Sequence, residues 1–100
     1  MYNYVGNMHL HSQYSDGFDS VQQIACMAEQ AGLDFIIMTD HFNLKALAEE
    51  GYYGSLLLLA GMEINDEENH YLALDIKEVI SNGEAQTVIE EVNKQQGIGI

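Results

Sequence analysis

Two histidines separated by a single residue are the first side chains in this sequence that could bind a metal ion. Alternate side chains of an extended chain point to the same side, so His9 and His11 would share one face while Met8 and Leu10 point toward a core. Asp16 follows within a short turn and adds a carboxylate oxygen. Imidazole nitrogens combined with a carboxylate suit zinc, manganese or iron better than calcium or magnesium. Taken alone, this motif could equally be a pair of polar residues on a half-exposed strand.

The remaining histidines favour a metal site over that alternative. The chain contains 4 histidines in all. His41 ends one apolar run, Glu63 closes another, and His70 opens a third. Because these residues stand at the ends of apolar runs and not on helices or in irregular loops, we expect them to share one site with the first two histidines.

The composition is that of one small, acidic, folded domain. Of the 100 residues, 47% are hydrophobic, and no proline-rich, Gly/Ser-rich or repeated segment is present. We therefore expect residues 1–100 to form a single domain. The net charge of -13 disfavours an extended nucleic acid as a partner, and without arginine the chain has no bidentate clamp for a phosphate.

The cysteine content and the absence of long apolar stretches indicate where the protein is found. With Cys26 as the only cysteine, no internal disulfide can form, which fits a reducing compartment, and its apolar neighbours predict a packing role. No basic region followed by an apolar run begins the chain, and no stretch is long enough to span a membrane. We expect a cytoplasmic protein with no membrane partner.

Apolar periodicity predicts strands that alternate with helices. The predicted strands are residues 3–11, 33–38, 56–62 and 71–76, with a further strand beginning at 97–100. The predicted helices run from Asp19 or Ser20 to the region of Gly32, from Asn43 to Glu50, and from Glu84 to Gln96. Val88, Ile89 and Val92 are expected on the inner face of the last helix, and residues 66–69 in a loop.

This alternation predicts an α/β fold with mostly parallel strands and right-handed crossovers. In such sheets, functional groups gather beyond the carboxyl ends of the strands. His70 begins its apolar run and does not end it, so the direction of that strand stays open at the level of sequence. The predicted strands are too few to close an eight-stranded barrel.

Four motifs in this order resemble the PHP (polymerase and histidinol phosphatase) domain. They are H-L-H followed by S-D-G, then T-D-H after an apolar strand, then G-M-E, and then a histidine at the head of an apolar run. The resemblance covers nearly the whole chain. It implies the N-terminal part of a distorted (β/α)7 TIM-like barrel, with two or three divalent metal ions (zinc, manganese or iron) at its mouth that hydrolyse phosphoesters.

The resemblance also implies a role for each motif residue. His9 and His11 resemble ligands of one metal, and Glu63 resembles the carboxylate that bridges it to a second metal. His70 resembles a ligand of that second metal. Asp16 and His41 resemble ligands of a third. Asp40 has no ligand role in the family pattern, and we expect it to hydrogen-bond and orient a ligand.

The sequence departs from the family pattern at its C-terminal side. Family members carry a further histidine motif and a D-x-H motif, and neither occurs in these 100 residues. Each expected metal would then lack a protein ligand, which predicts a truncated domain. A half-barrel of this kind would expose a sheet edge, through which the chain could associate with itself.

Two functions from different classes are compatible with these residues. The first is a metal-dependent phosphoesterase that uses a metal-activated water on a small phosphorylated substrate, namely a phosphomonoester, a nucleotide or a short nucleic-acid end. The second is a non-catalytic remnant that binds metal weakly or acts as an interaction module. A metallohydrolase of the amidohydrolase type, acting on a C–N bond, is disfavoured by the S-D-G and T-D-H motifs.

Overall fold

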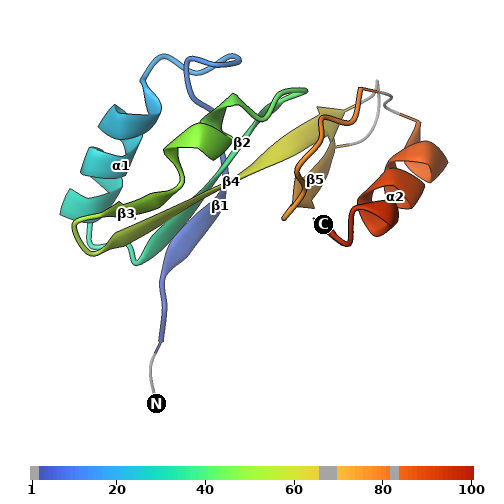
Figure 1. Ribbon diagram of the computed structural model, residues 1–100. Coiled ribbons are helices and arrows are strands. Elements are labelled where there is room, and N and C mark those ends of the chain that lie inside the picture. Colours follow the sequence, from blue (N-terminus) through green and yellow to red (C-terminus); the bar gives the residue numbers. More distant parts are fainter. Residues whose placement is uncertain (1–2, 66–69, 82–83) are drawn as a thin grey trace.

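A single six-stranded sheet organises the fold, and the long strand β4 lies at its centre (Figure 1). The computed structural model describes residues 3–65, 70–81 and 84–100. The strands are β1 (Gly6–Leu10), β2 (Phe35–His41), β3 (Gly51–Tyr53), β4 (Leu56–Asn65), β5 (His70–Leu74) and β6 (Ile98–Gly99). The helices are α1 (Val21–Gln30), the 3-10 helix η1 (Lys45–Glu49) and α2 (Ala85–Lys94). The sheet order is β1-β2-β4-β5-β6, with β3 also paired to β4.

The neighbouring strands of this sheet pair in both parallel and antiparallel directions. β1 runs parallel to β2, and β2 runs parallel to β4. β3, β5 and β6 pair antiparallel with their neighbours, so the sheet is mixed and the prediction of mostly parallel strands is wrong for the second half of the chain. For β3 and β5 the reason is connection length. Residues 54–55 join β3 to β4 and residues 66–69 join β4 to β5, which is too short for the crossover that parallel neighbours require.

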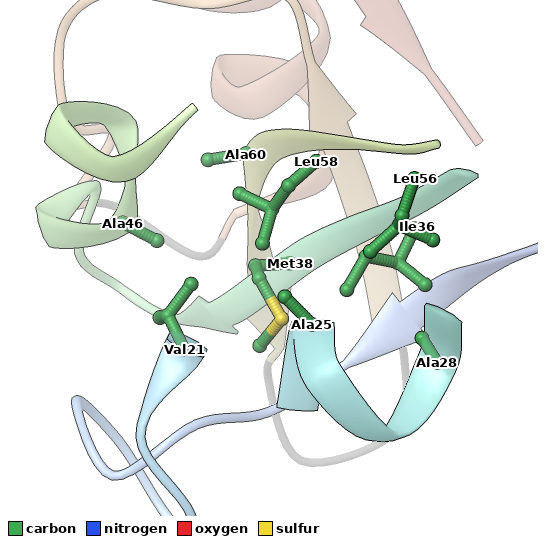
Figure 2. Close-up of a cluster of buried hydrophobic side chains, with 9 residues drawn as sticks. All are labelled: Val21, Ala25, Ala28, Ile36, Met38, Ala46, Leu56, Leu58 and Ala60. Atoms are coloured by element: carbon green, nitrogen blue, oxygen red, sulfur yellow. The ribbon is translucent and has the colours of Figure 1, made fainter. Parts of the chain in front are cut away.

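The first hydrophobic core lies between α1 and the parallel strands (Figure 2). Ser20 caps α1, as one of the two predicted caps. Its hydroxyl accepts a hydrogen bond from the backbone N–H of Gln23, and the Gln23 side chain accepts one from the Ser20 N–H. This reciprocal pair satisfies donors that the first helical turn leaves open. The buried side chains of this core are Val21, Ala25, Ala28, Ile36, Met38, Ala46, Leu56, Leu58 and Ala60.

A second core forms where α2 packs near β4 and β5. Its buried members are Met62, Ile64, Ala73, Ile76, Ile80, Val88 and Val92. Val88 and Val92 lie one helical turn apart, as predicted, but Ile89 is 42% exposed, so the expectation that it faces inward is wrong. Successive residues of a helix are rotated by about 100°, which carries Ile89 away from the face that Val88 presents.

Successive side chains of β4 point alternately toward the two cores and toward the opposite face of the sheet. The even-numbered residues from Leu56 to Ile64 are all buried in one core or the other. Residues two apart in a strand share a face, so both cores lie on the same side of β4. Glu63 belongs to the opposite face.

Several local expectations need correction. Met8 is exposed and only Leu10 of that pair packs against the first core. Cys26 is exposed, so its predicted packing role is wrong. The helix expected to begin at Asn43 is the 3-10 helix η1, and the loop expected at 66–69 lies outside the described residues. Within the described ranges, no helix has the length and apolar character needed to cross a membrane.

Leu58 and Leu59 provide a matched test of this arrangement, because they are neighbours on β4 with opposite orientation. Leu58→Ala should lower the free energy of unfolding by about 2–5 kcal/mol, since it opens a cavity in the first core. Leu59 is 38% exposed, and Leu59→Ala should cost clearly less. Urea unfolding followed by circular dichroism measures both values. Equal losses for the two variants would contradict the assignment of faces.

Candidate metal centre

The ends of several strands meet at one edge of the sheet, on the face that lies opposite the cores. β1, β2 and β4 are parallel, so their carboxyl ends lie at the same edge. The register of β2 and β4 places His41 directly beside Glu63. β5 runs antiparallel to β4, so it begins at this edge with His70. This settles the strand direction that the sequence left open.

Glu63 is the centre of the cluster, although its side chain is only 1% exposed. Its Oε1 lies 2.6 Å from Nε2 of His9 and 2.6 Å from Nε2 of His11. Its Oε2 lies 2.5 Å from Nδ1 of His70. The carboxylate therefore presents one oxygen to two imidazoles and the other oxygen to a third, an orientation in which a carboxylate can bridge two cations.

Asp16 joins a second group of donors beside the first. Its Oδ1 lies 2.5 Å from Nδ1 of His11, and its Oδ2 lies 3.2 Å from Nε2 of His41. The rings of His11 and His41 meet edge to face, with their centroids 4.3 Å apart. The structure thus brings together every side chain that the sequence proposed as a ligand: His9, His11, Asp16, His41, Glu63 and His70.

The chemistry of these donors fits divalent cations. Both ring nitrogens of His11 face a carboxylate oxygen, yet a neutral imidazole carries only one N–H. A lone pair would therefore point at a carboxylate unless the ring is protonated or these side chains share a bound cation. Two groups have donor atoms within 4.8 Å of one another: His9, His11 and Glu63, and His11, Asp16 and His41. Nitrogen and carboxylate ligands in such groups suit zinc, manganese and iron.

Contacts within the cluster shift the pKa values of its members. Burial acts to raise the pKa of Glu63, but hydrogen bonds from three histidines outweigh it and lower the pKa from 4.5 to about 2. Burial acts to lower the pKa of His11, but hydrogen bonds with two carboxylates raise it above the usual 6.5. The pKa of Asp16 is lowered, chiefly by its hydrogen bond with His11. A metal ion that binds His11 therefore competes with a proton that the neighbouring carboxylates favour.

Asp40 points to the opposite side of the sheet from His41 and accepts hydrogen bonds from the loop that leads to Asp16. It is 1% exposed. Its Oδ1 accepts hydrogen bonds from the Ser12 N–H and the Ser15 hydroxyl, both at 2.7 Å, and its Oδ2 accepts one from the Ser12 hydroxyl at 2.8 Å. We expected Asp40 to hydrogen-bond a ligand side chain. Within the described part of the chain, its side-chain partners are the two serines that lie between His11 and Asp16.

Two asparagines contact the cluster and were not identified from the sequence. Oδ1 of Asn65 lies 3.0 Å from Nδ1 of His41. The side-chain amide of Asn43 donates to the backbone carbonyls of His41 and Tyr14, both at 3.0 Å. Asn65 could have been found, because it lies two positions after Glu63 and strand alternation places both on one face. Asn43 lies in an irregular segment for which no periodicity gives a direction.

The sequence matches the family that its motifs indicated. The model of the PHP domain aligns with residues 7–96. This chain belongs to the PHP domain family. No curated protein matches it.

Solved structures with the same fold are longer than this chain. A two-domain protein from Bacteroides vulgatus ATCC 8482 that contains a predicted PHP-like metal-dependent phosphoesterase matches with a TM-score of 0.72 and 20% identity, covering 94% of this chain and 33% of that one. A candidate metal-dependent phosphoesterase from Bifidobacterium adolescentis ATCC 15703 matches with a TM-score of 0.53 and 24% identity, covering 72% and 28%. At these identities the likeness shows the fold, a mixed α/β arrangement with a curled sheet. This chain spans 33% of the first structure and 28% of the second.

The metal-free chain should lose stability in acid through Glu63. The unfolded chain protonates this carboxyl near its ordinary pKa of 4.5, whereas the folded chain does so only at about 2. Its contribution is therefore present above pH 4.5 and is lost as the pH falls to about 2. Urea unfolding in the presence of a chelator, at about pH 6 and about pH 3, measures this loss. Glu63→Gln should show a smaller loss than the wild type, and an identical loss would contradict the assignment.

Asp40→Asn should lower the free energy of unfolding by about 1–3 kcal/mol, because an amide nitrogen cannot accept the hydrogen bond from the buried Ser12 hydroxyl. Asp34→Asn is the matched control. Asp34 is exposed and accepts a hydrogen bond from the backbone N–H of Val5, so its replacement should change stability by about 0.5 kcal/mol or less. Chemical unfolding compares the two variants, and a larger loss for Asp34→Asn would refute the structural role of Asp40.

Proposed function

We propose that this cluster is the metal centre of a phosphoesterase that hydrolyses a phosphomonoester, a nucleotide or a short nucleic-acid end with a metal-activated water. The observation that carries the proposal is the convergence of His9, His11 and His70 on the buried carboxylate of Glu63, with Asp16 and His41 beside them. Membership of the PHP family supports it. The fold that we propose for the site is the N-terminal part of a distorted (β/α)7 barrel.

The proposed metal ligands are His9, His11, Asp16, His41, Glu63 and His70. When bound, two or three zinc, manganese or iron ions would polarise the phosphoryl oxygens and make the attacking water more acidic. The imidazoles hold cations without adding charge. Glu63 faces histidines with both of its oxygens, so it can join neighbouring cation positions, and Asp16 adds the second carboxylate.

The charges of the chain favour a small substrate. The proposed ligands are histidines and acids, and the whole sequence contains only 3 lysine and arginine residues, so the chain has few permanently positive side chains to offer a phosphate. Attraction for a phosphate at this site would come from bound cations, whose reach in salt is limited to about 10 Å. The net charge of -13 opposes the approach of a long polyanion. A compact phosphomonoester or nucleotide lies within the reach of the bound cations and carries much less negative charge than a long polyanion.

A second candidate function is metal binding without turnover. The exposure of the donors favours it, since Asp16 and His70 have side chains that are 63% and 67% exposed. Among the residues that the structure describes, each of the two donor groups supplies three ligands. In this case the chain would bind metal weakly and could associate with another copy through the edge strands β1 and β6.

Metal content is the first property to measure. Protein prepared without chelator should contain about two equivalents of zinc, manganese or iron per chain, as a binuclear centre requires. His9→Ala and Glu63→Ala should each lower this content, because they remove donors from the central group. Glu90→Ala is the matched control, since Glu90 is an exposed acid on α2 whose removal should leave the content unchanged. Elemental analysis gives all four values.

Hydrolysis assays on generic phosphomonoesters and on nucleotides, with each metal added back, then separate the two candidates. Turnover that falls together with metal content in His9→Ala supports the phosphoesterase. A chain that binds metal but does not turn over supports metal binding without catalysis. Metal content that neither substitution changes would refute the site itself.

A further inference from the structure

An uncharged side chain contacts one histidine of the cluster at the ring nitrogen that faces away from the carboxylates. Asn65, the last residue of β4, places its Oδ1 3.0 Å from Nδ1 of His41. On the other side of the ring, Nε2 lies 3.2 Å from Oδ2 of Asp16 and 3.9 Å from Oε1 of Glu63. The imidazole of His41 is therefore fixed between an amide and the carboxylates of the cluster.

The contact with Asn65 favours one of the two ring nitrogens of His41 as the site of the proton. An amide oxygen accepts hydrogen bonds and cannot donate one, so with Oδ1 of Asn65 toward the ring the donor is Nδ1. In a neutral ring this leaves the lone pair on Nε2, the nitrogen that faces Asp16 and Glu63. This is the tautomer that can bind a cation at the cluster.

We propose that Asn65 is a positioning residue that fixes His41 as the Nδ1–H tautomer and thereby sets the metal affinity of the group formed by His11, Asp16 and His41. The inference rests on the proposed function, because it concerns the same metal centre. His11 is not controlled in this way, since both of its ring nitrogens face carboxylates.

The sheet itself holds the two residues in place. His41 is in register with Glu63 on the neighbouring strand, and Asn65 lies two positions beyond Glu63 on the same face of β4. The amide also orients the ring without adding another negative charge to a cluster that already contains Asp16 and Glu63. An aspartate at position 65 would be a stronger acceptor and would keep the same tautomer.

The tautomer can be read directly in the metal-free chain by long-range proton–nitrogen NMR of the imidazole rings, recorded at increasing pH until each ring carries a single proton. His41→Gln assigns the signals. The wild type and Asn65→Asp should show a proton on Nδ1 of His41, and Asn65→Leu should shift the proton toward Nε2, which can donate to Asp16. A proton on Nε2 in the wild type, or an unchanged tautomer in Asn65→Leu, would overturn the proposal.

Zinc affinity, measured by competition with a chelating dye, tests the consequence for metal binding. Asn65→Leu should weaken zinc binding by about 10–100-fold, the usual loss when the hydrogen-bond partner of a ligating histidine is removed. Asn65→Asp should bind zinc at least as tightly as the wild type. Asn93→Leu, an exposed position on α2, is the matched control and should not differ from the wild type. Unchanged affinity in Asn65→Leu would refute the role of Asn65.

The two measurements distinguish failure of this inference from failure of the proposed function. A wild-type chain that binds no zinc would refute the metal centre, whereas the tautomer of His41 in the metal-free chain still decides whether Asn65 positions the ring. Zinc binding that is equal in the wild type and in Asn65→Leu would leave the metal centre in place and reject only the role of Asn65.

Discussion

A carboxylate buried among histidines is the interaction on which the rest of the site depends. An ionised carboxylate that leaves water without partners costs several kcal/mol, so Glu63 can stay charged in its buried position only because the imidazoles surround it. This requirement fixes the register of β4. A slip by one residue would turn Glu63 into the hydrophobic core and Met62 toward the histidines.

The ends of β2 and β1 also place histidines around Glu63. Asp40 and His41 are adjacent and point to opposite faces of the sheet. Asp40 therefore binds the two serines between His11 and Asp16, while His41 contributes its ring to the cluster. The pairing of β1 with β2 shifts register between Asn7 and Leu10. The Thr39 hydroxyl accepts a hydrogen bond from the Leu10 N–H and donates one to its carbonyl, where a regular ladder would use backbone groups. Such irregularities re-aim side chains, here those at the end of β1.

Much of the site could be predicted because its residues come from strand ends with clear apolar patterns. Three features each predict the sheet face and the strand end at which a residue lies: the H-x-H spacing, the run that ends in His41 and the run that ends in Glu63. Parallel pairing then brings these strand ends together at one edge of the sheet. Family membership is confirmed. The assignment of these residues as metal ligands stays a prediction.

What could not be predicted depends on contacts between distant segments. The antiparallel pairing of β3 and β5 with β4 follows from short connections, which the apolar pattern alone does not reveal, and β3 is too short to show alternation. The exposure of Cys26 depends on which side of α1 meets the sheet. The contact of Asn65 with His41 could be anticipated as a shared face but not as a hydrogen bond, because its direction depends on the ring orientation.

The position of the cluster links the two halves of the molecule. His9, His11, Asp16 and His41 come from the segments that enclose the first core, whereas Glu63 lies between Met62 and Ile64 of the second core and His70 begins β5 beside it. β4 is the strand that the two cores share. Cations held between these groups would bind residues from both halves in the folded state and could not do so in an unfolded chain. Metal binding at this cluster would therefore be thermodynamically coupled to the association of the two cores, and each would strengthen the other.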